Sequence, residues 1–412
     1  MKKILLIVFL IFASVTIGFS QNVQPENNSI DFYYIRARDF RSPSKNIRTD
    51  AGKILLEKIN SAQKTIDFAF YGLSGQNEIL EALVGAQKRG VVVRGIVDKN
   101  IENKNDYSGT EYSIQKLGEN VVKTDYKTEI EKLNKIKNKE IDFKYDFFKG
   151  HIMHNKFCII DDEIVWTGTV NVSSTGTGGF NENNACLISS KDVAKIFKRE
   201  FEQMYVKELF HENKSPIYSK KGINIDDKNI QIYFSPNKYI INTVILPEIE
   251  KAQDYIYLSM FLITDNKIVK NLIDAHNRGV KIKMIIDAYH ALQPYSKHQQ
   301  LRQAGIKIKV ENWAGKMHAK TVIIDDKTII SGSANWTYSA FKYNDENLLI
   351  FRNATKEALF LKKEFEQSWR SIPNKWLYAN PKPEGKDSRY SCTDGVDNDH
   401  NGLFDNEDPA CK

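Results

Sequence analysis

Apolar and polar positions alternate between helical and extended spacing along the first part of the chain. After residue 48, apolar residues recur with the spacing of one helix face, at Ile54, Leu55, Ile59 and Ala62. An apolar run at 65–71, a second helical pattern at 78–89 and another apolar run at 91–98 follow. This order predicts helix, strand, helix and strand, which is typical of a layered α/β architecture. Residues 22–48 are polar and predict only a loosely ordered segment.

Residues 244–290 repeat this pattern. The matching stretches are Ala252-Gln253 with Ala62-Gln63, 255–261 with 65–71, Arg278-Gly279-Val280 with Arg89-Gly90-Val91, and Asp287 with Asp98. The copies are 189 residues apart at these aspartates but 164 apart at the motif described next, so the first copy carries about 25 extra residues. We place this insertion at 126–150. Duplication therefore organises the chain.

One polar motif occurs in both copies. It reads HNKFCIIDDEIVWTGTVN at 154–171 and HAKTVIIDDKTIISGSAN at 318–335. Each apolar run, the Asp-Asp pair after it and the following β-branched run predict a strand, a turn and a second strand. Because alternate residues of a strand share a face, each histidine projects with its lysine, namely His154 with Lys156 and His318 with Lys320.

An imidazole beside an ammonium group suits a phosphate ester. The ammonium and an asparagine amide hold anionic oxygens while the imidazole attacks phosphorus or protonates a leaving oxygen. For a single copy, a hairpin whose histidine only forms hydrogen bonds is the simpler explanation. Five polar or special residues that recur in register favour chemistry instead, because two such sets supply one nucleophile and one acid.

The repeated motif resembles the HKD signature of the phospholipase D superfamily. Its residues here are His154, Lys156, Asp161, Gly168, Thr169 and Asn171, and His318, Lys320, Asp325, Gly332, Ser333 and Asn335. The resemblance spans about residues 50–370 and implies an α/β fold of two homologous halves, each a mixed sheet flanked by helices. A pseudo-twofold axis relates these halves and brings both histidines into one cleft. We place them at 49–210 and 228–372.

The resemblance also implies a two-step mechanism without a catalytic cofactor. His154 attacks phosphorus to form a phosphohistidine, while His318 protonates the leaving alkoxide and then activates water; this order follows the family and not the sequence. Four side chains hold the phosphoryl oxygens: Lys156, Lys320, Asn171 and Asn335. Asp161 and Asp325 belong to the motif, but they lie at the strand–turn end, where a structural ion pair is the alternative to a catalytic role.

In the family, a downstream glutamate or asparagine binds the second ring nitrogen of the catalytic histidine and fixes its tautomer. Glu346 and Glu182 each lie eleven residues after the asparagine of their motif. Glu346 fits this role well. In the first copy Asn183 or Asn184 is an alternative to Glu182.

Three functions are compatible with these residues. The first is hydrolysis of phospholipid headgroups, the second is cleavage of DNA or RNA by a secreted nuclease, and the third is a binding module with a degenerate site. Neither motif lacks a residue, which disfavours the third. The chain has 59 basic and 52 acidic residues, and its net charge of +7 falls to +5 without Lys2 and Lys3. This excess suits an anionic substrate without choosing between lipid and nucleic acid.

The insertion at 126–150 interleaves lysines with aromatic residues. We expect it to rim the mouth of the active site and to contact lipid headgroups or stacked bases. A solvated helix with a few aromatic side chains on the core is the alternative. A peripheral membrane contact and a monomeric state are further expectations.

Residues 1–20 combine two lysines with an apolar run of ~14 residues, as in a secretory signal peptide. An uncleaved anchor is the alternative, but it needs roughly 20 apolar residues to span a bilayer. We therefore expect a secreted or periplasmic bacterial protein without a later transmembrane span. Cys158 and Cys186 lie in apolar runs and are expected to be buried thiols, with a disulfide as the alternative in an oxidising compartment.

The C-terminal region changes in composition. Residues 373–391 contain prolines and charges without apolar periodicity, which predicts a linker. Residues 392–411 then follow the spacing of a calcium loop, with ligands at Asp397, Asp399, Asn401, Leu403, Asp405 and Asp408. They resemble the short calcium-binding repeats of bacterial surface and secreted proteins, so we expect a structural Ca²⁺ and a disulfide between Cys392 and Cys411. A disordered acidic tail is the alternative.

Overall fold

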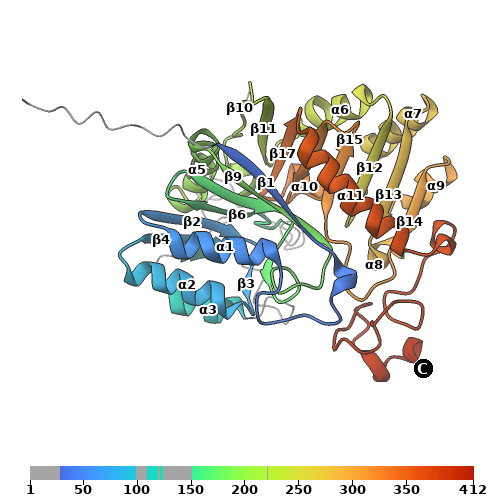
Figure 1. Ribbon diagram of the computed structural model, residues 1–412, viewed down its shortest axis with the longest axis horizontal. Coiled ribbons are helices and arrows are strands. Elements are labelled where there is room, and N and C mark those ends of the chain that lie inside the picture. Colours follow the sequence, from blue (N-terminus) through green and yellow to red (C-terminus); the bar gives the residue numbers. More distant parts are fainter. Residues whose placement is uncertain (1–27, 99–108, 119–120, 124–150, 220) are drawn as a thin grey trace, which may run out of the picture.

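The structure is a computed structural model that describes residues 28–98, 109–118, 121–123, 151–219 and 221–412 (Figure 1). The predicted signal segment 1–20 and the insertion 126–150 lie outside these residues.

The described residues form two large mixed sheets, one in each half of the chain (Figure 1). The first has the strand order β1-β9-β7-β6-β2-β4-β5, with β2, β4 and β5 parallel and the other pairs antiparallel. Its strands are β1 Ser29–Ile35, β2 Thr65–Phe70, β4 Val92–Val97, β5 Val121–Lys123, β6 Lys156–Ile160, β7 Ile164–Gly168 and β9 Asn183–Ser189.

The second sheet repeats this arrangement, with the order β10-β11-β17-β16-β15-β12-β13-β14. Its strands are β10 Ile223–Ile225, β11 Lys228–Ser235, β12 Tyr255–Met260, β13 Lys281–Ile286, β14 Lys307–Val310, β15 Lys320–Ile324, β16 Thr328–Gly332 and β17 Glu346–Arg352. The predicted fold of two α/β halves with mixed sheets is confirmed.

Helices cover the outer faces of both sheets and also lie between them. The first half contributes α1 Asp50–Ser61, α2 Asn77–Lys88, α3 Thr110–Leu117 and α5 Lys191–Tyr205. The second contributes α6 Leu246–Lys251, α7 Asn266–Asn277, α8 Ala288–Ala291, α9 His298–Gln303, α10 Tyr338–Lys342 and α11 Thr355–Ser371. The predicted helix around Ile54 begins at Asp50 because Thr49 caps it and accepts a hydrogen bond from the Gly52 amide.

The central strands serve two cores at once because successive side chains point to opposite faces. In β6, Phe157 and Ile159 join a core shared by both halves, whereas Cys158 and Ile160 face α1 and α2. The shared core also holds buried side chains of α5 and α11, which lie between the sheets. The halves are therefore fused through one continuous apolar interior.

The prediction that residues 22–48 are only loosely ordered is wrong for 29–35, which form strand β1. β1 pairs antiparallel with β9 from Ser29–Ser189 to Ile35–Asn183 at the edge of the first sheet. Its side chains are mostly only half buried, so their pattern is too weak to identify a strand from the sequence.

The Asp-Asp pair of each motif forms the turn of a tight hairpin, as predicted. Asp161 and Asp162 have φ angles of 54° and 56°, and Asp325 and Asp326 have 52° and 54°. Two successive left-handed residues match the twist of antiparallel strands, and aspartate tolerates this conformation better than most residues.

Candidate active site

Both motif histidines lie where the two halves meet. The residue before each histidine forms a parallel bridge with the other half, Met153 with Asp345 and Met317 with Glu182. The His154 amide donates to Asp345 O at 2.9 Å, and the His318 amide donates to Glu182 O at 2.9 Å. The backbone of each half thus positions the histidine of the other.

The ring of each histidine is also held from the opposite half. His154 Nδ1 lies 2.8 Å from Glu346 Oε2, and His318 Nδ1 lies 3.0 Å from Asn183 Oδ1. Because both partners are acceptors, each ring carries its proton on Nδ1 and presents Nε2 for chemistry. Glu346 stands at the position that the sequence predicted.

Glu182 does not contact a catalytic ring, which corrects the first-copy prediction. Its carboxylate accepts hydrogen bonds from Tyr34 Oη and the Ala37 amide, both at 2.8 Å, and from Ser368 Oγ. Asn183, the alternative that the sequence left open, binds the ring instead. The strand positions explain this difference. β9 begins at Asn183 and β17 at Glu346, so equivalent strand positions are 163 residues apart, whereas the histidines are 164 residues apart.

The lysines lie buried beside the histidines. Lys156 Nζ donates to His154 O at 2.7 Å, and Lys320 Nζ donates to His318 O. Each ammonium also lies near an aromatic ring, 5.4 Å from that of Tyr71 for Lys156 and 4.7 Å from that of Phe261 for Lys320. The two motifs therefore build equivalent environments.

The electrostatics join both motifs into one cluster. Burial, then Lys320, Lys156 and His154, hold the pKa of His318 well below its ordinary value. Burial lowers the pKa of His154 to about 4 and that of Lys156 to about 7, although Glu346 opposes both shifts. The pKa of Lys320 also falls well below its usual value, through burial and then Lys156. Such a cationic, water-poor cluster fits a phosphate.

The G-T/S-x-N segments lie at the same end of each sheet. Gly168 and Gly332 have φ angles of 146° and 148°, and a Cβ at either would collide with the neighbouring strand. After Gly168, Thr169 Oγ1 donates to Asn183 Oδ1 at 2.8 Å, so the motif hydroxyl fixes the partner of His318. Asn171 and Asn335 follow these turns at the lysine end of the hairpins.

Asp161 and Asp325 lie at the far end of β6 and β15 from the lysines, so the structure separates them from the histidines. Asp161 accepts hydrogen bonds from the amides of residues 63, 64 and 65, and Asp325 from those of 253, 254 and 255. Their inclusion among catalytic residues is therefore corrected: they anchor the hairpin turns through backbone amides instead of through ion pairs.

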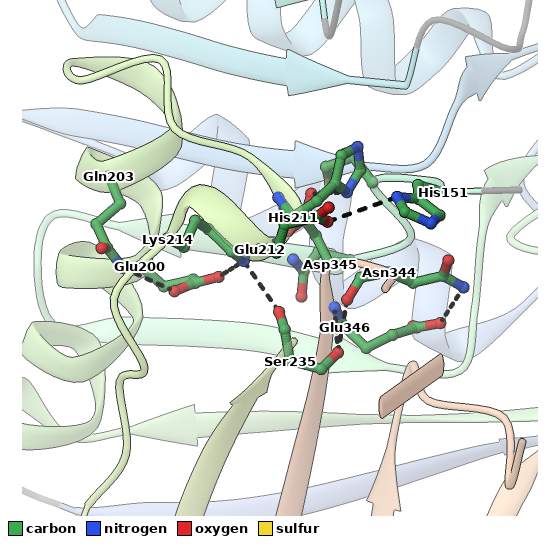
Figure 2. A network of polar contacts seen from close by, with 12 residues as sticks. His151, Glu200, Gln203, His211, Glu212, Lys214, Ser235, Asn344, Asp345 and Glu346 are labelled. Carbon is green, nitrogen blue, oxygen red and sulfur yellow. Dashed lines mark hydrogen bonds and ion pairs between the residues drawn. The ribbon is translucent and has the colours of Figure 1, made fainter. Parts of the chain in front are cut away.

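A buried polar network supports Glu346 from behind (Figure 2). Ser235 Oγ accepts the Glu346 amide at 3.1 Å, and Asn344 Nδ2 contacts Glu346 Oε1 at 3.4 Å. The neighbouring Asp345 lies 2.7 Å from Lys214 Nζ and 3.0 Å from His211 Nδ1. No sequence motif predicts this network, because Lys214 and His211 come from the connection after α5.

The C-terminal tail only partly matches the predicted calcium loop. Carboxylate oxygens of Asp399 and Asp408 lie within 4.8 Å of each other and of one from Glu384, a residue of the predicted linker. Asp397 and Asn401 stay in the loop, where the Gly402 amide donates to Asp397 Oδ2. The remaining predicted ligands are Leu403, whose amide donates to Asn401 Oδ1, and Asp405.

Asp405 is turned away from this group. Its carboxylate accepts hydrogen bonds from the amides of Asp394 and Gly395, both at 3.0 Å. The set of Glu384, Asp399 and Asp408 consists of hard oxygen donors and fits Ca²⁺ in chemistry, with Glu384 in addition to the predicted ligands.

The cysteines divide into two classes. Cys392 and Cys411 form the predicted disulfide, which closes the tail. Cys158 and Cys186 are free and buried, and burial raises the pKa of Cys186 to about 12. The thiol prediction for this pair is confirmed.

The family model described as "Cardiolipin synthase, PLD-like domain" matches residues 55–205 and 245–369. The chain belongs to the phospholipase D superfamily. Two curated relatives are about a third identical to this chain over the aligned residues. "Phospholipase D" of Rickettsia prowazekii is 33% identical over 147 residues, covering 35% of this chain and 69% of that protein. "Mitochondrial cardiolipin hydrolase" of Xenopus laevis is 30% identical over 145 residues, covering 34% and 67%.

One solved structure supports the same fold. Phosphatidylserine synthase of Haemophilus influenzae aligns over 85% of this chain and 90% of its own, with a TM-score of 0.57 and 13% identity. The superfamily member Nuc of Salmonella typhimurium covers 35% of this chain and 97% of its own, at 26% identity and a TM-score of 0.33. In the part of the present chain that the structure describes, no helix has the length and apolar character needed to span a bilayer.

Proposed function

We propose that this protein is a phosphodiesterase that hydrolyses phospholipid headgroups through a phosphohistidine intermediate. One observation carries the proposal: His154 and His318 both keep Nδ1 bound to an acceptor of the opposite half, while Lys156 and Lys320 lie beside them. Two neutral imidazoles with free Nε2 atoms match the needs of a nucleophile and a proton carrier.

In the first step, His154 Nε2 attacks phosphorus and the bond to the headgroup oxygen breaks. The new phosphoimidazole is cationic, and Glu346 at Nδ1 offsets this charge. The bound phosphate anion supports uptake of a proton at His318 Nε2 against the cationic neighbours of the ring, and His318 then gives this proton to the leaving oxygen and becomes neutral. In the second step, His318 takes a proton from water as that water displaces His154 from phosphorus.

The lysine and asparagine side chains complete the site. Lys156 and Lys320 neutralise the nonbridging oxygens, and they are buried, so their charge acts at low effective dielectric. Asn171 and Asn335 are assigned to the same oxygens from their place in the motif. Both catalytic sets come from one chain, and a monomer therefore suffices for this mechanism.

The experiment is a substrate panel assayed with purified protein. Bis(4-nitrophenyl) phosphate, vesicles of phosphatidylcholine or cardiolipin, and single-stranded or duplex DNA are incubated with wild type and with His154→Ala. We expect hydrolysis of the small diester and of lipid, and its loss in the variant. His276→Ala, on α7 outside the site, is the matched control. Cleavage of DNA without cleavage of lipid would favour the nuclease alternative, and no wild-type turnover would refute both.

We also propose export to an oxidising compartment and a structural Ca²⁺ in the tail. The apolar segment 1–20 and the Cys392–Cys411 disulfide support the first proposal. The carboxylates of Glu384, Asp399 and Asp408 support the second. Removing Ca²⁺ with a chelator should lower the melting temperature of the protein without changing the initial rate. A melting temperature independent of Ca²⁺ would contradict the calcium site.

A further inference from the structure

Two neighbouring segments of the second half form an exposed surface beside the active site. Residues 237–243 follow β11, and residues 337–343, which include α10, begin two residues after Asn335. The Asn237 amide donates to Phe341 O at 2.8 Å, so the two segments lie side by side. We call them the α10 surface. This surface therefore begins next to a side chain that the mechanism assigns to the phosphoryl oxygens.

The α10 surface combines exposed tyrosines with lysines. Tyr239 and Tyr338 are 60% and 54% exposed. Lys238 Nζ lies 5.3 Å from the ring centroid of Tyr239. Lys342 Nζ lies 4.8 Å from the ring centroids of both Tyr338 and Tyr343. Each exposed ring is thus paired with an ammonium group, which the negative face of the ring attracts.

Three lysines give the α10 surface a positive charge. Its two segments contain no aspartate or glutamate. In the part of the chain that the structure describes, no carboxylate lies within ion-pair distance of Lys238 or Lys342. Lys267 of α7 donates to Asn242 Oδ1 at 3.2 Å and adds a third positive charge at the edge of the surface. A surface with this charge suits an anionic partner.

Two acidic side chains border the α10 surface without neutralising it. Asp265 is buried and caps α7 by accepting hydrogen bonds from the amides of Lys267 and Ile268. Glu212 lies 3.6 Å from His151 Nδ1, on the side of the first half. Because these carboxylates are engaged elsewhere, the positive charge of the surface remains available.

The corresponding segment of the first half is covered by the chain itself. Residues 172–180 are almost entirely buried beneath 40–48, where Arg48 Nε donates to Gly178 O at 2.7 Å. In the second half 237–243 has the same place in the chain order, after the strand that pairs with β17. It nevertheless leaves α10 partly exposed. The second half thus exposes a segment whose counterpart is buried in the first half.

The ring geometry favours a lipid surface over a nucleic acid strand. A base stacks on a ring face, but the Tyr343 ring already stacks on His151 at 4.6 Å and lies under Lys342. The rings of Tyr338 and Tyr343 are inclined at 80°, so they form no common stacking platform. Tyrosine beside lysine is instead typical of the boundary between lipid headgroups and acyl chains.

We propose that the α10 surface docks on a bilayer that contains anionic lipids. The inference rests on the proposed function, because it names the surface that brings a phospholipid headgroup to the catalytic histidines. Lys238 and Lys342 bind lipid phosphates, and Tyr239 and Tyr338 enter the layer between headgroups and acyl chains. Docking beside Asn335 brings the phosphodiester next to the site.

The first test measures binding to vesicles by co-sedimentation, with His154→Ala in every protein so that lipid is not hydrolysed. Vesicles contain phosphatidylcholine alone or mixed with phosphatidylglycerol, and we expect tighter binding to the mixed vesicles. Lys238→Met with Lys342→Met should weaken that binding about 30-fold, the value of two lysines near an anionic surface. Tyr239→Ala with Tyr338→Ala should weaken binding to both kinds of vesicle.

Tyr112→Ala with Lys116→Met is the matched control. Tyr112 is 55% exposed on α3, where it lines a groove with α2, and Lys116 Nζ lies 5.4 Å from its ring centroid. This pair repeats the tyrosine and lysine of α10 outside the α10 surface. Its replacement should leave binding to both kinds of vesicle unchanged, and thermal melting checks the fold of every variant.

The second test separates docking from chemistry in proteins that retain His154. Both double variants of the α10 surface should raise KM for mixed vesicles, while kcat and hydrolysis of bis(4-nitrophenyl) phosphate stay unchanged. Absent vesicle binding, or equal binding of all variants, overturns the docking surface and spares the proposed function. Weaker binding to single-stranded DNA with unchanged binding to vesicles also overturns it, in favour of a nucleic acid surface. Vesicle binding without hydrolysis of any diester refutes the proposed function alone.

Discussion

The two halves share one fold but hold their histidines differently. His154 is backed by the carboxylate of Glu346, and His318 by the amide of Asn183. A carboxylate stabilises a positive ring, whereas an amide fixes the tautomer without adding charge. The comparison supports His154 as the ring that becomes a cationic phosphohistidine and His318 as the ring that releases its proton readily. Duplication supplied two similar sets, and one side chain separates their roles.

The residues that precede Glu346 and Asn183, which are Asp345 and Glu182, also differ in how strongly their environments favour a negative charge. Burial raises the pKa of Asp345, but Lys214 and His211 outweigh it and hold the pKa at about 2. Its counterpart Glu182 has a raised pKa because burial dominates and its partners are neutral donors such as Tyr34. The His154 side is therefore built around charge, and the His318 side around neutral hydrogen bonds.

The largest effect should come from replacing either histidine. With a lipid substrate, His154→Ala and His318→Ala should each lower kcat by about 10³-fold or more. Bis(4-nitrophenyl) phosphate separates the roles of the two histidines, because nitrophenolate leaves without a proton. There His318→Ala should retain a burst of nitrophenolate in rapid-mixing experiments, while His154→Ala should show none. A burst only in His154→Ala would reverse the assignment of roles, and circular dichroism checks the fold of both variants.

The second largest effect on kcat should come from replacing the side chains that bind the Nδ1 atoms of the two histidines. Glu346→Gln keeps a side-chain acceptor but removes the charge, and we expect kcat to fall by about 10²-fold because the cationic intermediate loses its counter-ion. Asn183→Asp adds a charge beside His318 and should weaken its acidity, with a smaller loss on lipid and none on the nitrophenyl ester. Steady-state kinetics of both variants on both substrates measure this difference. Equal losses of kcat in the two variants would contradict the proposed difference between the halves.

The third effect is the pH dependence of kcat/KM, which reports the free enzyme. His154 must be neutral to attack, and its pKa of about 4 keeps it neutral above that pH. Lys156 must be charged, and its pKa of about 7 means that this charge is lost as the pH rises through about 7. With bis(4-nitrophenyl) phosphate, whose leaving group needs no proton from His318, activity should therefore rise through pH 4 and fall above pH 7. Lys156→Arg should extend activity to higher pH, and an unchanged upper limb would assign that limb to another group.

The two halves, the motif residues and Glu346 could be predicted from the sequence, because each recurs at a fixed spacing that a hairpin or strand imposes. The choice between Glu182 and its neighbours could not be predicted, because a shift of one residue in β9 exchanges the side chain that meets His318. Such a register is set by pairing with other strands, which a linear spacing does not contain.

Contacts between segments that are distant in the chain could not be predicted from the sequence either. Lys214 and Ser235 reach the network around Glu346 from connections without a repeated motif. Glu384 joins Asp399 and Asp408 from a segment whose prolines predicted only a linker. These residues are placed by tertiary packing, so neither hydrophobic periodicity nor motif spacing could identify them.

The smallest effect on activity should come from the paired turn aspartates, where the halves are alike. Asp161 and Asp325 accept equivalent sets of backbone amides far from the histidines. Asp161→Ala and Asp325→Ala should each lower the free energy of unfolding by about 1–2 kcal/mol, as loss of a helix cap does, and leave kcat unchanged. Urea unfolding and initial rates measure both quantities. A loss of kcat in one variant alone would show that the asymmetry between the halves extends beyond the ring partners, because a purely structural anchor acts only on stability.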